Sequence, residues 1–527
     1  MSLSPLSDRR ADDEVDDPRR RTFILIAACT SLIAVVASVS GLNVAQADLA
    51  KELGASQTDL LWIINGYTIA LAALLMPIGA IGDRWGRKKV LVTGLIIFTL
   101  ANLAASMADG VTWLLASRIV AGAAAAMIMP ATLSVITSSF PASERDRAIG
   151  IWAGFAGAGG ILGLVGSAFV IDNLTWPWVF AMPVVLAVAG LLLTLAFVPH
   201  SREHSEHPFD TLGSILSAIG LGAIVLGIHE GPERGWTSPL ALAGLALGGA
   251  SLVAFCAWEL RHPKPLLQLR LFRNRMLASG TLSLLIVFSV LLALFLVLVQ
   301  FLQAVLGYSA LKAALGLMPM AVLVMPLSAI SPKIAARVGM RAMFVGGALL
   351  VAVGLVLMGT LATQTYVSII PGLLCVAAGA GVLMTPGTTA ITSGLPASEQ
   401  GVASALNDTV RELGGALGVA LIGSVLSATY STKVAPVADT LPPEAAHYVK
   451  GGIGGAYVVS QYLGDAGTEL LATARAAFLE AWTSAMWVSA AIAVAAAVFA
   501  LVWTPARRAE SSWIAGPGTD ADPRIEP

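Results

Sequence analysis

The fold follows from the segment Gly79-Ala80-Ile81-Gly82-Asp83-Arg84-Trp85-Gly86-Arg87-Lys88-Lys89-Val90-Leu91, which lies between two long apolar runs. Its glycines allow a tight turn, and the segment holds one acid and four cations. The positive-inside rule keeps a basic turn between hydrophobic helices on the cytoplasmic side of a membrane. The segment therefore predicts membrane-spanning helices on both sides of it, and the direction in which the chain threads.

The composition of the 527 residues excludes a soluble protein. Hydrophobic residues make up 57% of the chain and charged residues only 12%, whereas soluble domains contain about 25% charged residues. Only helices and closed barrels can span a bilayer. Because the apolar runs last about 20 residues, and do not alternate over about 10, they predict an all-α membrane protein.

The apolar runs predict fourteen transmembrane helices, arranged as two sets of six with two helices inserted between them. The runs fall at residues 23–44, 60–81, 90–108, 112–138, 148–171, 178–198, 211–228, 238–259, 277–304, 313–331, 342–361, 367–391, 400–428 and 474–503. The expected domains are a polar tail at 1–21, an N-terminal six-helix bundle at 22–199, a linker with two inserted helices at 200–275, a C-terminal six-helix bundle at 276–503 with a long outer loop at 430–470, and a second tail at 504–527.

The basic residues predict the orientation of the chain. Of the 31 lysines and arginines, twenty-three fall on the expected cytoplasmic side and six at the outer side. This asymmetry predicts a multi-pass protein of a bacterial-type plasma (inner) membrane, with both termini and both tails cytoplasmic. The remaining two cations, Arg118 and Arg411, fall inside helices.

The sequence gives no sign of catalytic or metal chemistry. The three cysteines lie in apolar runs, and no metal-ligand spacing or phosphate-binding loop is present. All six histidines fall in segments that we expect to be loops: His200, His204, His207, His229, His262 and His447. We therefore expect no enzyme, no metal, no cofactor and no nucleic-acid partner. A membrane enzyme or sensor remains a remote alternative.

Several motifs resemble the fourteen-helix drug/proton antiporter branch of the major facilitator superfamily, the QacA/EmrB type, over nearly all of residues 23–503. The segment 79–91 resembles the family loop Gly-x-Leu-Ala-Asp-Arg-x-Gly-Arg-Lys/Arg between helices two and three. The other motifs are Leu61-Trp62-Ile63-Ile64-Asn65-Gly66-Tyr67, Arg118-Ile119-Val120-Ala121-Gly122, Arg145-Asp146-Arg147-Ala148-Ile149-Gly150-Ile151-Trp152, Gln303-Ala304-Val305-Leu306-Gly307-Tyr308-Ser309 and Arg411-Glu412-Leu413-Gly414-Gly415-Ala416-Leu417-Gly418. The resemblance implies a major facilitator fold whose two halves rock around a midplane site.

The chain departs from the family pattern at several positions. Ser38 stands where the family usually has an aspartate in helix one. Helix four has Ala121 where a glutamine is common, and helix five has Gly163-Leu164 in place of its Gly-Pro. Because the usual helix-one acid is absent, the proton-coupling acid is expected elsewhere.

Four charged residues are candidates for proton coupling: Arg118, Asp408, Arg411 and Glu412. A charge at the bilayer centre costs roughly 2.5–3.5 kcal/mol, so each requires a reason. Spacings of three and four place Asp408, Arg411 and Glu412 near one helical face. Two carboxylates sharing one arginine predict that one of them takes up a proton readily. The alternatives are a solvated ion pair at the cytoplasmic mouth for Asp408, and a structural anchor for Arg118.

Six polar or aromatic residues are candidates for lining a substrate cavity. An amide deep in an apolar helix faces a cavity or another helix rather than lipid, and aromatic rings suit flat apolar compounds. For Trp62 and Tyr67 the interfacial aromatic belt is an equal alternative. The six are Asn43, Trp62, Asn65, Tyr67, Gln300 and Gln303.

The resemblance also implies a cytoplasmic gate and a glycine-rich fifth helix. The gate residues would be Gly82, Asp83, Arg84, Gly86 and Arg87, with Asp83 and Arg87 latching the two halves while the outside is open. Glu399 would suit the positive N-terminal end of helix thirteen. Glycines at small-xxx-small spacing let helices approach closely, and these are Gly150, Gly154, Gly159 and Gly163.

Together these features predict a proton-coupled secondary active exporter of amphipathic drug-like compounds, a multidrug efflux protein driven by the proton gradient. Its expected partners are small amphipathic substrates, protons and the lipid bilayer. A dedicated exporter of an endogenous metabolite or self-made antibiotic is the alternative, because the same scaffold would serve it equally well.

Overall fold

The computed structural model describes residues 15–200, 209–361 and 365–505. Fourteen helices in this part of the chain are long and apolar enough to cross a membrane. No strand occurs among the described residues. The predicted all-α membrane protein with fourteen transmembrane helices is therefore confirmed.

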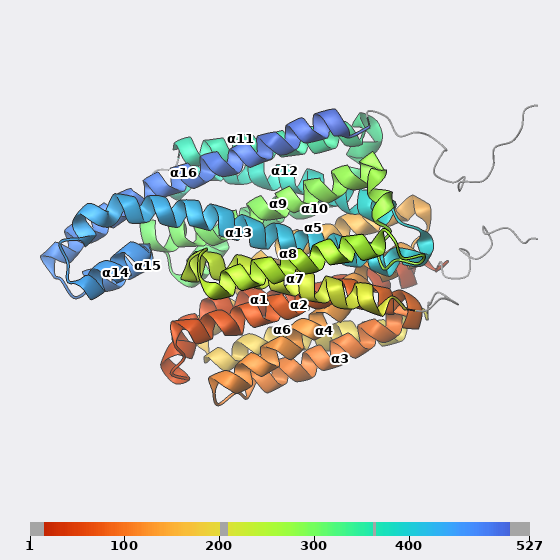
Figure 1. Cartoon of the computed structure of the whole chain (residues 1–527), viewed down its shortest axis with the longest axis horizontal. Helices are drawn as coiled ribbons and strands as arrows, with labels where there is room; N and C mark the ends of the chain where they lie inside the picture. Colours follow the sequence, from red (N-terminus) through yellow and green to blue (C-terminus); the bar gives the residue numbers. More distant parts are fainter. Residues whose placement is uncertain (1–14, 201–208, 362–364, 506–527) are drawn as a thin grey trace, which may run out of the picture.

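The first six spans form the N-terminal bundle; in Figure 1 the labels of α1, α2, α3, α4 and α6 are in the lower half, and α5 lies beside α10. Asp17 caps the first of them and Pro18 occupies its first position, so the helix begins before the apolar run does. The six are α1 (Pro18–Glu52), α2 (Gln57–Trp85), α3 (Arg87–Ser106), α4 (Val111–Ser139), α5 (Ala142–Asn173) and α6 (Ala181–Phe197).

The inserted pair and the C-terminal bundle follow. The inserted hairpin consists of α7 (Thr211–Arg234) and α8 (Pro239–Glu259). The spans of the C-terminal bundle are α9 (Arg275–Gln300), extended by a π-helical turn over Phe301–Val305, α10 (Ala310–Val338), α11 (Met340–Leu361), α12 (Tyr366–Thr392), α13 (Gln400–Ala438) and α16 (Asp465–Trp503).

The two bundles lie side by side, with the inserted hairpin over their junction (Figure 1). Contacts of α2 with α13 and of α5 with α10 join the bundles, and α7 packs against both α2 and α13. The start of α1 and the end of α16 lie at the same end of the molecule, on the right of Figure 1. We call this the gate end, because Asp83 also lies there.

The segment 79–91 is two helix ends around a single glycine, and not the longer loop that we expected. Gly86 separates α2 from α3 with a φ of 109°, a conformation that only glycine adopts without strain. Gly339, with a φ of 87°, separates α10 from α11 in the same way. The two bundles therefore share a one-residue glycine turn between their second and third spans.

The segment 430–470, expected as an outer loop, is largely helical. It contains the end of α13, the start of α16, and the short helices α14 (Pro443–Gly451) and α15 (Ile453–Ser460). Both α13 and α16 have 39 residues, which corresponds to about 58 Å, whereas a bilayer core is about 30 Å thick. This helical extension projects at the end opposite the gate end (Figure 1).

Candidate functional site

Asp83 joins the two bundles at the gate end. Both of its carboxylate oxygens lie 2.8 Å from the backbone nitrogen of Gly401, and Oδ2 also accepts from Val402 N–H at 3.1 Å. Arg87 Nη2 lies 3.2 Å from Asp83 Oδ1. The start of α13 has no side-chain cap of its own, so Asp83 of the other bundle caps it, and its charge balances the positive helix end.

Close backbone approach makes this gate contact possible. A Cβ atom added to Gly79 would lie 2.6 Å from the carbonyl oxygen of Gly401, so neither position has room for a side chain. Gly82 differs, because a Cβ there would meet nothing within 4 Å. Arg84 is half-buried beside it. Gly79 is therefore required for the close packing of α2 against α13, and Gly86 for the turn between α2 and α3. Gly82 is required for neither.

Arg118 lies at the centre of a polar cluster in the N-terminal bundle. Its side chain is only 1% exposed, and Nη1 donates to Ser38 Oγ at 2.8 Å. Ser38 in turn donates to Asn102 Oδ1 at 3.0 Å. The ring of Tyr67 lies 4.2 Å from the guanidinium carbon. Arg118 forms no ion pair with any carboxylate that the structure describes.

Arg411 lies at the centre of a second polar cluster, on α13. Its Nη1 lies 3.3 Å from Oδ1 of Asp408, whose side chain is fully buried. Asn407 donates to the same oxygen at 3.1 Å. The guanidinium also lies over the ring of Phe288 on α9, at 4.5 Å, and near that of Trp152 on α5, at 5.3 Å. Because Asp408 is buried, the interpretation of a solvated pair at the cytoplasmic mouth is wrong.

Glu412 is the half-buried acid beside this pair. It interacts electrostatically with Arg411 and Asp408, and also with Tyr67 of α2. Glu412 therefore lies near residues of both bundles. Among the described residues, Arg411 forms an ion pair with Asp408 alone. The two acids therefore do not share the arginine equally, as the spacing had suggested.

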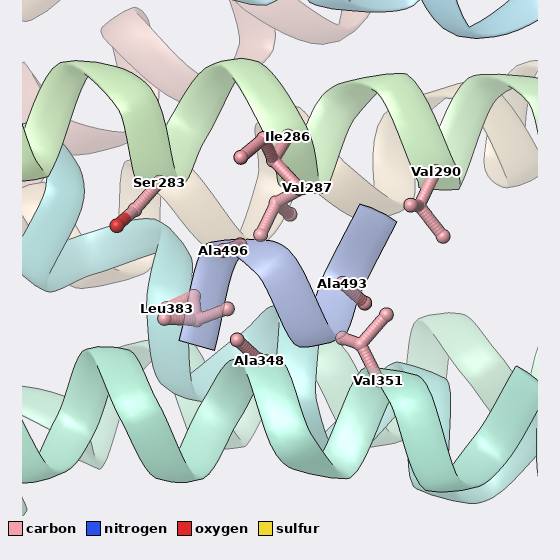
Figure 2. Close-up of a pocket in the computed structure, with 9 residues that line it drawn as sticks. All are labelled: Ser283, Ile286, Val287, Val290, Ala348, Val351, Leu383, Ala493 and Ala496. Atoms are coloured by element: carbon pink, nitrogen blue, oxygen red, sulfur yellow. The ribbon is translucent and has the colours of Figure 1, made fainter. Parts of the chain in front are cut away.

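A small cavity inside the C-terminal bundle is not large enough to hold a substrate. Figure 2 shows side chains of α9, α11, α12 and α16 converging on it. Its volume is about 10 Å³, enough for about one water molecule. The lining is almost entirely apolar: Ser283, Ile286, Val287, Val290, Ala348, Val351, Leu383, Ala493 and Ala496. A substrate path is therefore better sought between the bundles than within this one.

The family model described as Major Facilitator Superfamily matches residues 26–419. The chain belongs to the major facilitator superfamily. It is 34% identical over 459 residues to the multidrug efflux pump LfrA of Mycolicibacterium smegmatis, with 86% of this chain and 91% of the relative covered. It is 28% identical over 427 residues to the multidrug resistance protein Stp of Mycobacterium tuberculosis, with 81% and 80% covered. The resemblance to fourteen-helix drug efflux transporters is confirmed, and the chain is a membrane transporter rather than an enzyme.

Solved structures support the same fold. The proton:xylose symporter XylE matches with a TM-score of 0.59 at 14% identity, covering 92% of this chain and 96% of its own. A bacterial homologue of the lysosomal transporter Spinster, in an inward-facing conformation, matches with a TM-score of 0.59 at 18% identity, covering 92% and 98%. Major facilitator drug efflux pumps draw on ion gradients and use no cofactor.

The predicted cavity residues on α2 differ in burial and in contacts in this major facilitator protein. Tyr67 is fully buried and donates to Val35 O at 3.2 Å, so it does not belong to an interfacial aromatic belt. Trp62 is half-buried. Asn65 Oδ1 lies 2.7 Å from Nδ1 of His229 on α7. The expectation that every histidine lies in a loop is therefore wrong, because α7 continues six residues past the predicted end at 228.

The remaining cavity candidates lie in different surroundings. Gln300 is half-buried at the end of α9, and Gln303 is exposed in the π-helical turn. Asn43 lies in α1, but its side chain is outside the described residues. Among the described residues, no hydrogen bond joins Gln300 or Gln303 to Arg118 or Arg411.

The glycines of α5 face two different neighbours. Cβ atoms added to Gly150 and Gly154 would lie 2.6 Å and 3.1 Å from backbone atoms of α10, in the other bundle. At Gly163 the nearest atom would be in α1, at 2.7 Å, whereas Gly159 would meet α1 only at 3.5 Å. The first two glycines therefore allow contact between bundles, and Gly163 allows contact within one.

The sequence analysis missed two polar residues that complete the two clusters. Asn102 is fully buried in α3, where it accepts from Ser38. Asn407 accepts from Thr388 Oγ1 at 3.0 Å, which ties α13 to α12. An amide in the middle of an apolar helix was the available signal for Asn102, and the neighbouring acid Asp408 was the signal for Asn407.

Proposed function

We propose that this protein is a proton-coupled exporter of amphipathic drug-like compounds that works by alternating access, with both termini in the cytoplasm. The observation that carries the proposal is Glu412, a half-buried acid in a membrane helix. It interacts with Arg411 and Asp408 in its own bundle and with Tyr67 in the other. An ionisable residue in this setting marks an ion pathway by default.

Charge balance makes Glu412 the better proton carrier of the two acids on α13. Arg411 and Asp408 neutralise each other through their ion pair. Ionised Glu412 then leaves the cluster with a net negative charge, and protonation removes it. A cationic substrate and a proton would therefore compete for the same carboxylate, which is the requirement for exchanging one for the other.

The gate contact connects this chemistry to a conformational change. Asp83 holds the N-terminus of α13, the helix that also carries Glu412. In the proposed cycle the N-terminal bundle, 22–199, rocks against the C-terminal bundle, 276–503. The gate contact closes the cytoplasmic side while the outer side is open, and its release begins the inward-facing state.

The breadth of the substrate range is part of the proposal, since the relatives differ in theirs. LfrA and Stp are named for multidrug efflux and resistance, and a relative from Salmonella typhimurium, 31% identical over 422 residues, is named for methyl viologen resistance. The alternative, a dedicated exporter, is favoured by the 32% identical cephamycin export protein CmcT of Amycolatopsis lactamdurans. Apolar and aromatic surroundings of the two clusters favour the broader range.

Transport by the purified protein in liposomes tests the proposal. An imposed pH gradient, with a panel of fluorescent cations such as ethidium, should drive movement of several of them. A protonophore should abolish that movement. Transport that ignores the protonophore would contradict proton coupling, and movement of a single compound class from a chemically varied panel would favour the dedicated exporter.

A further inference from the structure

The inserted hairpin contacts both bundles, although it belongs to neither six-helix set. On α2, its partner is Ala73, whose Cβ lies 3.0 Å from a Cβ built on Gly222 of α7. On α13, Ile228 of α7 forms a buried apolar cluster with Ala416 and Ala420. If α2 and α13 move relative to each other, α7 cannot keep both contacts unchanged.

The two contacts differ in strength. Toward α2, His229 Nδ1 and Asn65 Oδ1 form a short hydrogen bond of 2.7 Å between partly buried side chains. Toward α13, the polar contact is longer, at 3.4 Å from Trp236 Nε1 to Ser424 Oγ, and Trp236 is exposed. Hydrogen bonds fix a helix at one position, whereas methyl groups such as those of Ala416 and Ala420 offer a smooth surface.

The two helices of the hairpin are closely packed and joined by a hydrogen bond. They approach so closely that a Cβ on Gly244 would lie 2.8 Å from the backbone nitrogen of Gly227. At the gate end of the hairpin, Asp210 caps α7 and accepts from Trp258 Nε1 of α8 at 3.0 Å. Glu259 accepts from the backbone of Leu267 just beyond α8. We therefore expect α7 and α8 to move as one body.

We propose that the hairpin moves with the N-terminal bundle, anchored by the His229–Asn65 hydrogen bond, and slides along α13 during transport. His229 is a positioning residue in this proposal, since it holds α7 on α2 without contacting substrate. The proposal rests on the alternating access of the proposed function, and is independent of which substrate or ion is carried.

Reversible cross-links between cysteines on α7 and each bundle test it. The starting protein would be the full chain with Cys29, Cys256 and Cys375 replaced by alanine. One variant carries Ala73→Cys and Gly222→Cys, and the other Ile228→Cys and Ala420→Cys, each linked by a short reducible bis-thiol reagent. We expect the α7–α2 link to leave ethidium efflux within twofold of the unlinked protein. The α7–α13 link should lower efflux at least tenfold, and reduction should restore it.

Each other outcome overturns the proposal. Loss of efflux with only the α7–α2 link would assign the hairpin to the C-terminal bundle. Loss with both links would mean that it moves relative to both bundles. Full activity with both links would mean that no sliding occurs.

Spin-label distances test the same motion without transport, so failure of the efflux function would not affect the result. Labels at Leu247 of α8 and Leu100 of α3 should give one narrow distance distribution. Labels at Leu247 of α8 and Val353 of α11 should give a broad or two-component distance distribution. All three side chains are exposed. His229→Leu should broaden the distance distribution between Leu247 and Leu100. The population of molecules in which the hairpin is displaced from α2 should rise two- to tenfold, which is the change in equilibrium expected from the loss of one hydrogen bond. His229→Gln can still form a hydrogen bond with Asn65, so it should not broaden this distribution. Equal broadening by the two variants would contradict the proposal that the His229–Asn65 hydrogen bond anchors the hairpin.

Discussion

Arg118 of α4 and Arg411 of α13 are both buried inside membrane helices, one in each bundle, but their partners differ. Arg411 has a buried carboxylate, Asp408, as its ion-pair partner and a second acid, Glu412, beside it. Arg118 has the hydroxyl of Ser38 and the ring of Tyr67. Both lie against aromatic rings, so the difference is in the acids. In the proposed mechanism, the C-terminal bundle would therefore bind the transported proton, and the N-terminal bundle would provide a fixed positive charge.

The largest effect expected from this difference is that of Glu412→Gln. The amide keeps the size of the side chain but cannot release a proton, so proton-driven efflux should fall at least a hundredfold, to background. Substrate binding should change less than about threefold. Efflux and binding measured on the same liposome preparation separate the two. Asp408→Asn is the matched variant. If coupled efflux survives in Glu412→Gln but is lost in Asp408→Asn, Asp408 and not Glu412 is the residue that carries the proton.

Stability should distinguish the two arginines next. Arg411→Met leaves buried Asp408 without its partner, and breaking such a pair costs about 3–5 kcal/mol. Arg118→Met leaves only a hydroxyl that still bonds Asn102, at a cost of about 1–3 kcal/mol. Unfolding of both variants in mixed micelles gives the comparison. Equal costs would mean that Arg118 has a carboxylate partner after all.

The sequence was sufficient for the spans and for the Asp408–Arg411 pair. Run lengths encode membrane crossing directly, and a spacing of three places two side chains on one helical face. It was not sufficient for Glu412, because spacings of three and four place all three side chains near one helical face and do not tell which of the two acids pairs with Arg411; the ion pair is with Asp408. Nor could it pair His229 with Asn65, since their contact depends on how the hairpin docks, which hydropathy does not encode.

The helix ends show the same limit. The residues that follow Pro18 are the three arginines Arg19, Arg20 and Arg21, so the apolar pattern places the start of α1 too late. The turns at Gly86 and Gly339 shorten expected loops to one residue, because neighbouring helices extend through their polar ends. Hydropathy marks the part of a helix within the bilayer and leaves the polar ends to capping residues and local packing.

The gate contact provides a third test, because here an acid of the N-terminal bundle, Asp83, caps a helix of the C-terminal bundle, α13. Asp83→Asn removes the charge that caps α13 and leaves Arg87 unpaired. Hydrogen bonds to a charged group contribute about 1.5–3 kcal/mol each, so the equilibrium between gate states should shift ten- to a hundredfold toward the open gate. Spin labels at exposed Ser143 and Val338 would report it as a longer distance across the gate end.

The matched control for the gate is Glu399→Gln. Glu399 lies at the same helix end but accepts from Gln268 Nε2, at 2.7 Å, and does not cap the helix. Its replacement should shift the gate equilibrium less than about threefold. A shift as large as that of Asp83→Asn would mean that total negative charge at this helix end, rather than capping by Asp83, closes the gate.

The smallest expected effect comes from making the N-terminal bundle resemble the C-terminal one. Ser38→Asp places a carboxylate where a hydroxyl now lies 2.8 Å from Arg118 Nη1, and the pairing should raise stability by about 1 kcal/mol. Combined with Glu412→Gln, it should restore proton-driven efflux to roughly a tenth of the original rate, an order-of-magnitude expectation for one buried acid replacing another. Ser38→Asn, which adds similar volume without the charge, is the control. Absence of any recovery would mean that a proton must bind on α13, the helix held by the gate contact, for the bundles to move.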